Sequence, residues 1–223
     1  MSKHLQNDLK SIEAALSQQA TLVEGMVQTA YRGLHDRCLG TAAEILSQET
    51  EVNAREVRIE EECLKTLALH QPVAIDLRRT AAALKINSDL ERIADLALNL
   101  AERTESLVEH PEIPIPAALQ QMVELAIGMV RDAHLAFIQL NTHLAASVCT
   151  RDDQVDALNR EIIAELITTM QQHPHRVEGS LHVFSAARIV ERIGDHATNI
   201  AEDVMYMVEG EIHRHRLQVH ISA

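Results

Sequence analysis

The sequence predicts an all-α protein made of two tandem, pseudo-symmetric three-helix antiparallel bundles. An internal repeat is the first reason: residues 90–103 (LERIADLALNLAER) and 190–203 (VERIGDHATNIAED) are identical at eight of fourteen positions. Apolar residues also recur at steps of three and four, as in helices. Turn residues are scarce, with seven glycines and five prolines in 223 residues, whereas strand-rich folds need turns about every 8–12 residues. The two segments lie 100 positions apart. A repeat unit of about 100 residues is too long for a solenoid and indicates a duplicated small domain.

Prolines and one glycine mark the expected helix ends. Proline inside a helix costs about 3 kcal/mol, so it separates helices well. Pro72, Pro174 and the three prolines of residues 110–116 interrupt the helical periodicity. Gly40 indicates another break, and we expect its counterpart at residues 147–152. The six helices are therefore predicted over residues 5–38, 42–69, 73–109, 117–147, 152–172 and 176–209.

The six segments fall into two copies of three. Gly25-Met26-Val27 matches Gly128-Met129-Val130 at an offset of 103, and Val52 matches Val155 at the same offset. The third segments match at an offset of 100, so the second copy lacks three residues before its third helix. Short connections favour antiparallel neighbours within each copy. We predict a first repeat over residues 1–109, a proline-rich linker over 110–116, a second repeat over 117–209 and a tail over 210–223.

Composition narrows the function. Four aromatic residues and 46% hydrophobic residues predict a core built from aliphatic side chains. A net charge of −13 argues against nucleic-acid binding, which needs clustered lysine and arginine. No run of about 18 apolar residues is present, and residues 1–16 lack the apolar core of a signal peptide. We therefore expect no direct membrane insertion, a cytoplasmic location, and idle thiols at Cys38, Cys63 and Cys149.

A ladder of carboxylates recurs in both copies. Residues four apart lie one above the other on a helix, which aligns Glu91 with Asp95 and Glu191 with Asp195. The second helix of each copy carries a similar pair, which we place near its start. In an antiparallel arrangement, the start of the second helix lies beside the end of the third, so the pairs can supply oxygen ligands to one cation. The predicted metal ligands are Glu49, Asn53, Glu91, Asp95, Asp152, Asp156, Glu191 and Asp195.

Salt-bridged surface is an alternative interpretation of the same ladders. Arg92 and Arg192 lie three residues before Asp95 and Asp195, and Arg188 lies three before Glu191. Acidic residues near a helix start also stabilise the helix dipole. Both interpretations stay open on the sequence alone.

Other features are weaker. Arg78-Arg79 could contact an anion or an acidic partner, and His213, His215 and His220 could bind metal or belong to a charged tail. No Ser-His-Asp set or glycine-rich phosphate loop is present, so nothing nominates a nucleophile or a general base, and we expect a protein that is not an enzyme. A metal-dependent enzyme using the carboxylates and a purely structural dimerisation module are the alternatives.

The motifs of both copies resemble the PhoU family of accessory proteins of bacterial phosphate-specific transport. Each copy has E-R-I-G/A-D followed by Asn and Ala-Glu, and Gln71-Pro72 with Asp76-Leu77-Arg78 supports the resemblance. Glu49-x-x-Val52-Asn53 and Asp152-x-x-Val155-Asp156 form a second matching pair. The resemblance covers nearly the whole chain.

The resemblance implies a negative regulator of phosphate uptake and of the phosphate-starvation regulon. Such proteins link the ATPase subunit of the phosphate ABC transporter to a phosphate-sensing histidine kinase, and a homodimer is expected. Some relatives carry multinuclear iron or zinc clusters, whose ligands map by position to the eight residues named above. Two departures are Ala94 in place of glycine and Asn53 where the second copy has Asp156. Both imply weaker metal binding in the first copy.

Overall fold

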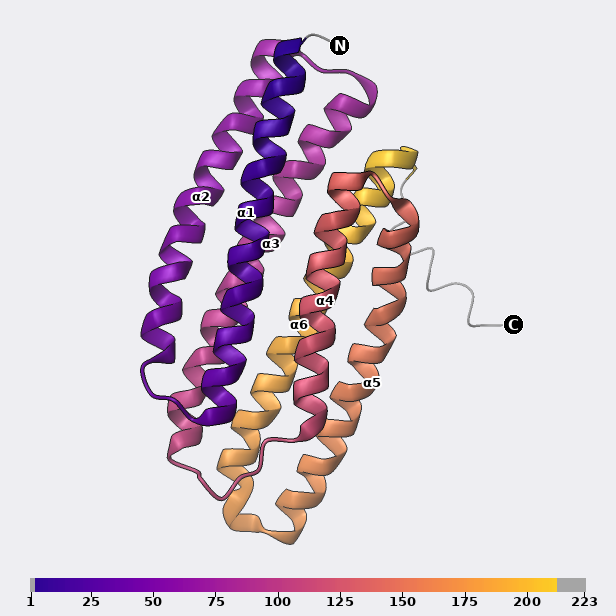
Figure 1. Ribbon diagram of the computed structural model, residues 1–223. Coiled ribbons are helices and arrows are strands. Elements are labelled where there is room, and N and C mark those ends of the chain that lie inside the picture. The colour runs from indigo at the N-terminus through magenta and orange to yellow at the C-terminus, as the bar shows by residue number, and fades with distance from the viewer. Residues whose placement is uncertain (1–2, 212–223) are drawn as a thin grey trace, which may run out of the picture.

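The computed structural model describes residues 3–211, and within this range the regular structure is entirely helical (Figure 1). The helices form two antiparallel three-helix bundles that lie side by side, as the repeat predicts. A 3-10 turn, η1 (Pro174–Arg176), precedes the last helix. The helices are α1 (Lys3–Asp36), α2 (Thr41–His70), α3 (Ala74–Val108), α4 (Ala117–Gln139), α5 (Thr142–Gln172) and α6 (Val177–Glu209).

Most helix ends lie close to the glycine and proline residues that predicted them. Gly40 adopts a φ of 91° immediately before α2, and Gly210 adopts a φ of 75° immediately after α6. Both values lie in the left-handed region, where glycine has no steric penalty. Gln71 ends α2 with its N–H donated to the Leu67 carbonyl, and Pro72 follows.

The predicted break at residues 147–152 is wrong. The chain turns instead at Leu140, which has a φ of 54°, and at Asn141, whose side-chain oxygen accepts a hydrogen bond from the Leu144 N–H. This is an N-terminal cap, and α5 begins ten residues earlier than predicted. The hydroxyls of Ser147 and Thr150 donate to backbone carbonyls of their own helix, so these residues do not interrupt it.

This correction changes the setting of the acidic residues. Asp152 lies in the third turn of α5, and Glu49 lies in the third turn of α2. The prediction that they sit at helix starts is therefore wrong. Because the effect of the helix dipole is confined to the first turn, the dipole does not explain these carboxylates.

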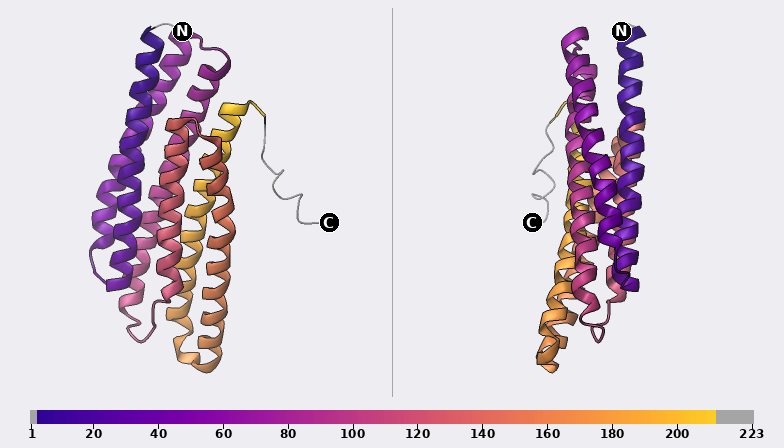
Figure 2. Two further views of the ribbon diagram at one scale, coloured as in Figure 1. Left: turned by 45° about the vertical axis from the view of Figure 1, so that its right-hand side comes forward. Right: turned by 90° about the vertical axis from the view of Figure 1, so that its left-hand side faces the viewer.

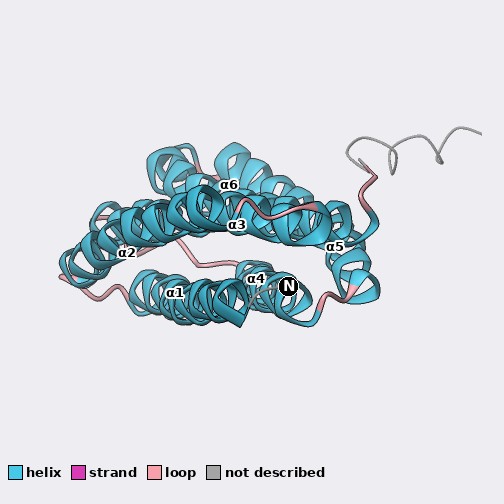
Figure 3. Cartoon of the chain, turned by 90° about the horizontal axis from the view of Figure 1, so that it is seen from above, coloured by secondary structure: helices cyan, strands magenta, loops and turns pink. Residues whose placement is uncertain are grey.

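The two bundles meet through α3 against α6 and α1 against α4. Seen from above, α1 and α4 form one row, with α2, α3 and α6 in the row behind (Figure 3). Helices α3 and α6 run in opposite directions, and α2 and α5 lie at opposite edges (Figure 2). Apolar side chains of both bundles join in one core, made mainly of alanine, leucine, isoleucine, valine and methionine.

Polar contacts join the bundles on one side of the α3–α6 interface. Lys85 Nζ lies 2.8 Å from Asp203 Oδ1, and His196 Nδ1 lies 2.8 Å from Asp89 Oδ1. The offset of 100 relates His196 and Asp89 to Leu96 and Ile189, which are buried apolar residues. The interface is thus pseudo-symmetric in shape but not in chemistry.

Arginines satisfy carbonyls at the ends of α3 and α6. Arg37 donates to the Leu107 carbonyl, and Arg78 Nε donates to the Met207 carbonyl at 2.8 Å. The last carbonyls of a helix have no partner within the helix, so these bonds stabilise the ends. Arg79 pairs with Glu13 of α1. The charges of Arg78 and Arg79 therefore serve contacts within the chain.

The proline-rich segment between α3 and α4 is packed against the second bundle. Its Ile113 is 1% exposed and belongs to the shared core. A Cβ atom on Gly179 of α6 would lie 2.5 Å from Ile113 Cγ1 and 2.8 Å from His110 Cβ. Glycine at position 179 thus permits the close approach of this segment to α6.

Candidate functional site

Four carboxylates of the second bundle face one another across α5 and α6. Asp152 and Asp156 come from α5, and Glu191 and Asp195 come from α6. Gly194 lies between the two pairs, where a Cβ atom would lie 3.7 Å from Asp152 Oδ1. The packing of α5 against α6 here brings the carboxylates into mutual electrostatic range. We call these four residues the second cluster.

Partial burial and like charges raise the pKa values of three carboxyls in the second cluster. Burial, followed by the charges of Asp195 and Asp156, raises the pKa of Asp152 to about 6. Burial is also the main cause of the raised pKa of Glu191 and of Asp195, and Asp156 raises both further. Like charges in one site disfavour ionisation, as does partial burial. An added cation would relieve both penalties.

Arginines compensate part of this charge, as the salt-bridge interpretation predicts. Arg188 Nη1 lies 2.5 Å from Glu191 Oε1, and Arg160 Nη1 lies 3.7 Å from Asp156 Oδ2. The pKa of Glu191 stays raised despite Arg188. The structure therefore contains ion pairs that the salt-bridge interpretation predicts, and metal binding at the ladder stays a prediction.

The first bundle has an equivalent group, the first cluster, on α2 and α3: Glu49, Asn53, Glu91 and Asp95. Here the Asn53 amide donates to Glu49 Oε1, while Asn53 Oδ1 is buried without a hydrogen-bond partner. Arg92 lies 3.6 Å from Glu91 and 3.7 Å from Asp95. Burial and the Asp95 charge raise the pKa of Glu91. In this cluster, an amide hydrogen bond therefore satisfies one oxygen of Glu49, and the Arg92 charge offsets part of the charge of Glu91 and Asp95.

The donor chemistry of both clusters fits a cation, but the donors are not gathered around one point. Within residues 3–211, no three histidine, cysteine, aspartate or glutamate side chains are arranged to hold a metal ion. Carboxylate and amide oxygens suit hard and borderline cations. The Asn53 Oδ1 atom, which has no hydrogen-bond partner, is a further oxygen that could coordinate a cation. Binding would require the side chains of a cluster to turn toward a common centre.

Two neighbours of the clusters were not among the predicted site residues. The Thr198 hydroxyl beside Asp152 favours the ionised carboxylate, and the Glu56 charge raises the pKa of Glu91. The spacing contains a signal for both. Thr198 lies seven residues after Glu191, and Glu56 lies seven after Glu49, so each continues the helix face of its ladder.

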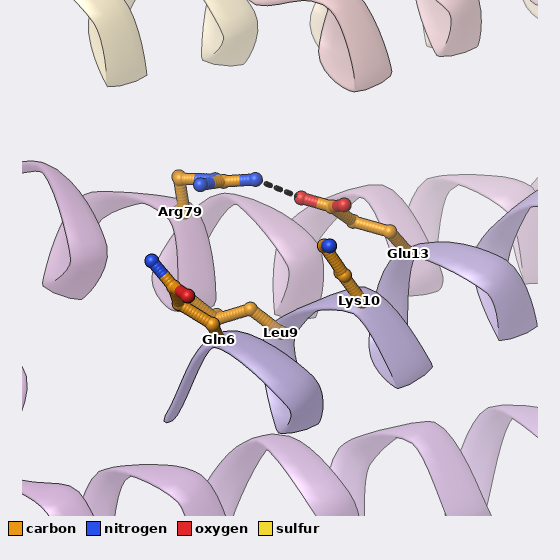
Figure 4. A pocket seen from close by; sticks show the side chains of 5 residues that line it. All are labelled: Gln6, Leu9, Lys10, Glu13 and Arg79. Atoms are coloured by element: carbon orange, nitrogen blue, oxygen red, sulfur yellow. Dashed lines mark hydrogen bonds and ion pairs between the residues drawn. The ribbon is translucent and has the colours of Figure 1, made fainter. Parts of the chain in front are cut away.

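Other predicted features do not belong to the clusters, although Cys149 lies three residues before Asp152, whose charge helps to raise its pKa. Burial raises the pKa of Cys63 to about 12 and that of Cys149 to about 11, which makes both thiols poor nucleophiles. His213, His215 and His220 lie outside the described residues. A cavity of about 190 Å³ lies beside the Arg79–Glu13 pair and is lined by none of the cluster residues (Figure 4).

The fold and the sites define a class: a duplicated three-helix bundle whose second and third helices carry a carboxylate cluster in each copy. The PhoU domain family matches residues 16–104 and 119–204, which are the two bundles. The chain belongs to the PhoU family. Among the described residues, every helix lacks the long, weakly charged apolar stretch that a membrane crossing requires.

Relatives and solved structures resemble the chain over nearly all of its length. A phosphate-specific transport system accessory protein PhoU homolog of Rhizobium meliloti is 34% identical, covering 91% of this chain and 86% of the relative. A homolog of the same description in Aquifex aeolicus is 36% identical, covering 94% and 95%. The crystal structure of PhoU from Pseudomonas aeruginosa superposes with a TM-score of 0.86 at 35% identity, covering 92% and 99%. The phosphate transport system regulatory protein PhoU of Streptococcus pneumoniae gives 0.87 at 25% identity, covering 93% and 98%.

Proposed function

We propose that this protein is a negative regulator of phosphate uptake and of the phosphate-starvation regulon. The observation that carries the proposal is the match of both bundles to the PhoU domain, together with relatives described as accessory proteins of phosphate-specific transport. The protein works in the cytoplasm as an adaptor. Its partners are the ATPase subunit of the phosphate ABC transporter and a phosphate-sensing histidine kinase.

An adaptor without a catalytic group acts by binding one state of its partner more tightly than another. A ligand shifts a conformational equilibrium only by its difference in affinity for the two states. Moving a kinase from 99% active to 99% silent needs a difference of about 5.5 kcal/mol. The long exposed faces of α2, α3, α5 and α6 provide area for such contacts, and a homodimer would double them.

The test is a deletion strain carrying a reporter of a phosphate-starvation promoter. The reporter should be expressed in phosphate-rich medium in the deletion strain and silent again after complementation. Pulldowns at high and low phosphate should recover the transporter ATPase and the sensor kinase. Normal repression in the deletion strain, with phosphate uptake intact, would refute the regulatory role.

We further propose that the clusters bind a divalent or transition metal, with iron and zinc as the expected ions. The raised pKa values of Asp152, Glu191 and Asp195 support this for the second cluster, because a cation would stabilise their ionised forms. Elemental analysis of protein purified without a histidine tag should detect metal, and Asp195→Ala should reduce it. Metal content that is nil, or unchanged by this substitution, would refute the proposal.

A further inference from the structure

An exposed apolar stripe on α6 leads directly into the second cluster. Val177, Leu181 and Phe184 are 39%, 52% and 37% exposed. They follow one another at steps of four and three residues, and Arg188, Glu191 and Asp195 continue the series at steps of four, three and four. Alternating steps of three and four define one face of a helix and match the seam of a coiled coil. We call this series the α6 seam.

A neighbouring helix also carries an exposed apolar side chain. Ile167 on the adjacent α5 is 46% exposed. The first bundle repeats the arrangement only in part: Leu77 is 45% exposed on α3, but Ala81 and the partly buried Leu84 stand where α6 has Leu181 and Phe184. Contiguous exposed apolar residues mark interaction surfaces.

We propose that the α6 seam is the docking surface for an amphipathic helix of a partner protein. Charge complementarity defines this helix: apolar residues to cover Leu181 and Phe184, and lysine or arginine to meet the carboxylates of Asp195 and Glu191, of which Glu191 is already paired with Arg188 at 2.5 Å. The inference rests on the proposed adaptor function and gives the partner's chemistry. An apolar helix face laid on a hydrophobic surface, with charges fixing its register, is a recurring mode of peptide recognition.

The orientation of the docked helix follows from its charges. The apolar half of the seam lies at the N-terminal end of α6, and the acidic half lies further along the helix. The N-terminal end of a helix carries partial positive charge, which is favourable next to carboxylates. The partner helix therefore runs antiparallel to α6, with its basic residues in its N-terminal half and its apolar residues in its C-terminal half.

The test uses a synthetic peptide of about three heptads, with lysines at the seam positions of its N-terminal half and leucines at those of its C-terminal half. Binding to the full-length protein is followed by fluorescence anisotropy in a buffer containing a chelator, so that metal does not compete. The wild-type protein should bind this peptide at least tenfold more tightly than a peptide with glutamates in place of the lysines. A peptide with its leucines moved off the seam should also bind at least tenfold more weakly.

Variants locate the surface. Leu181→Ser combined with Phe184→Ser should weaken binding at least tenfold, and Glu191→Gln should weaken it and reduce its salt dependence. Leu135→Ser is the matched control, because Leu135 is 39% exposed on α4. Its affinity should equal that of the wild type. Circular dichroism and thermal unfolding establish that each variant is folded, and Glu191→Gln provides a test that leaves the apolar residues intact.

Three results would overturn the inference: no binding of the lysine–leucine peptide, equal binding of the control peptides, or equal loss in Leu135→Ser. A wild-type dimer that becomes monomeric in the Leu181→Ser, Phe184→Ser variant would assign the seam to a second copy and also overturn it. The deletion strain tests the regulatory role separately. If the reporter is derepressed in the deletion strain but the peptide does not bind, only the docking inference is refuted. If the peptide binds but the reporter stays repressed, only the regulatory role is refuted.

Discussion

The two carboxylate clusters lie at equivalent places in the two bundles, but their charges are balanced differently. In the first cluster, the Asn53 amide donates to Glu49, and Arg92 lies within 4 Å of both Glu91 and Asp95. In the second, Asp156 stands where the first has Asn53. Four carboxylates then face one another, and the pKa of Asp152 rises to about 6.

The exchange of one amide for a carboxylate changes how much positive charge each of the two equivalent sites needs from outside. An asparagine supplies donors as well as an acceptor, so it can satisfy a neighbouring carboxylate without an external ion. An aspartate at the same place adds charge and acceptors only. The first cluster therefore has one carboxylate fewer than the second, although the pKa of its Glu91 is also raised and its Asn53 Oδ1 lacks a partner. We expect the second cluster to bind a cation more tightly. Reciprocal substitutions test this comparison directly.

The largest expected effect is on metal affinity after exchange of the differing residue. Asn53→Asp should raise the affinity of the first cluster for Mn²⁺ roughly ten- to a hundredfold, because ligand charge tunes the affinity of oxygen sites. Asp156→Asn should lower the affinity of the second cluster by a similar factor. Isothermal titration calorimetry of both variants and the wild type measures the change.

The exposed aspartate Asp153, next to the second cluster but outside it, provides the control for this exchange. Asp153→Asn should leave the affinity within about twofold, because an exposed charge is screened by solvent. If Asp153→Asn weakens Mn²⁺ as much as Asp156→Asn, the ion responds to general surface charge and the comparison between clusters fails.

A second effect is the stability of the metal-free first cluster. Asn53→Asp removes the hydrogen bond to Glu49 and places two carboxylates four residues apart. The lost bond costs about 1 kcal/mol and the repulsion about 0.2–0.5 kcal/mol, so the free energy of unfolding should fall by about 1–2 kcal/mol. Urea denaturation with chelator measures the loss, and added Mn²⁺ should restore it by binding the folded state. An unchanged midpoint would mean that the amide does not stabilise this site.

Sequence alone predicted the parts of the fold that local chemistry determines. Pro72 and Pro174 lie at helix ends because proline cannot continue a helix. The turn at Leu140 was missed because a leucine with a φ of 54° carries no turn signal of its own. Asn141 is the residue of that turn that the sequence could have indicated, since asparagine is a preferred N-cap residue. The break predicted at residues 147–152 is wrong because the helix continues there, with the Ser147 and Thr150 hydroxyls bonded to carbonyls of α5 itself.

The carboxylate ladders were predictable because they depend only on spacing along one helix. Which charges meet across helices depends on packing, and the sequence does not supply it. The pairing of Arg188 with Glu191 follows local spacing, but the closeness of Asp152 and Asp195 depends on the contact of α5 with α6 at Gly194. The Asp89–His196 contact likewise depends on how the bundles pack.

A third and smaller effect is the dependence of stability on pH. The pKa of Asp152 is raised from 3.8 to about 6 in the folded protein, so the folded state binds a proton more tightly than the unfolded chain. This carboxyl therefore lowers the free energy of unfolding as pH rises from about 4 to about 6. Asp152→Asn should stabilise the metal-free protein above pH 6, and its advantage should vanish toward pH 4.

Thermal unfolding across this pH range measures the effect, and Glu91→Gln is the comparison variant in the first cluster, because the pKa of Glu91 is raised there. Arg92 partly offsets the raised pKa of Glu91, so Glu91→Gln should give a smaller gain than Asp152→Asn. If Asp152→Asn is no more stable than the wild type at pH 7.5, or is stabilised equally at pH 4, ionisation of Asp152 does not destabilise the folded state.

The smallest expected effect concerns the second residue that distinguishes the clusters, Gly194 against Ala94. A Cβ atom at position 194 would lie 3.4 Å from Val155 Cγ1, an ordinary van der Waals contact. Alanine in a helix interior is favoured over glycine by about 1 kcal/mol. Gly194→Ala should therefore stabilise the protein by at most about 1 kcal/mol, and Ala94→Gly should destabilise it by a similar amount. A loss of more than about 2 kcal/mol in Gly194→Ala, typical of overpacking, would instead mean that α5 and α6 need the glycine to approach each other. In that case the two clusters would differ in the distance between their helices as well as in the residue at the position of Asn53 and Asp156.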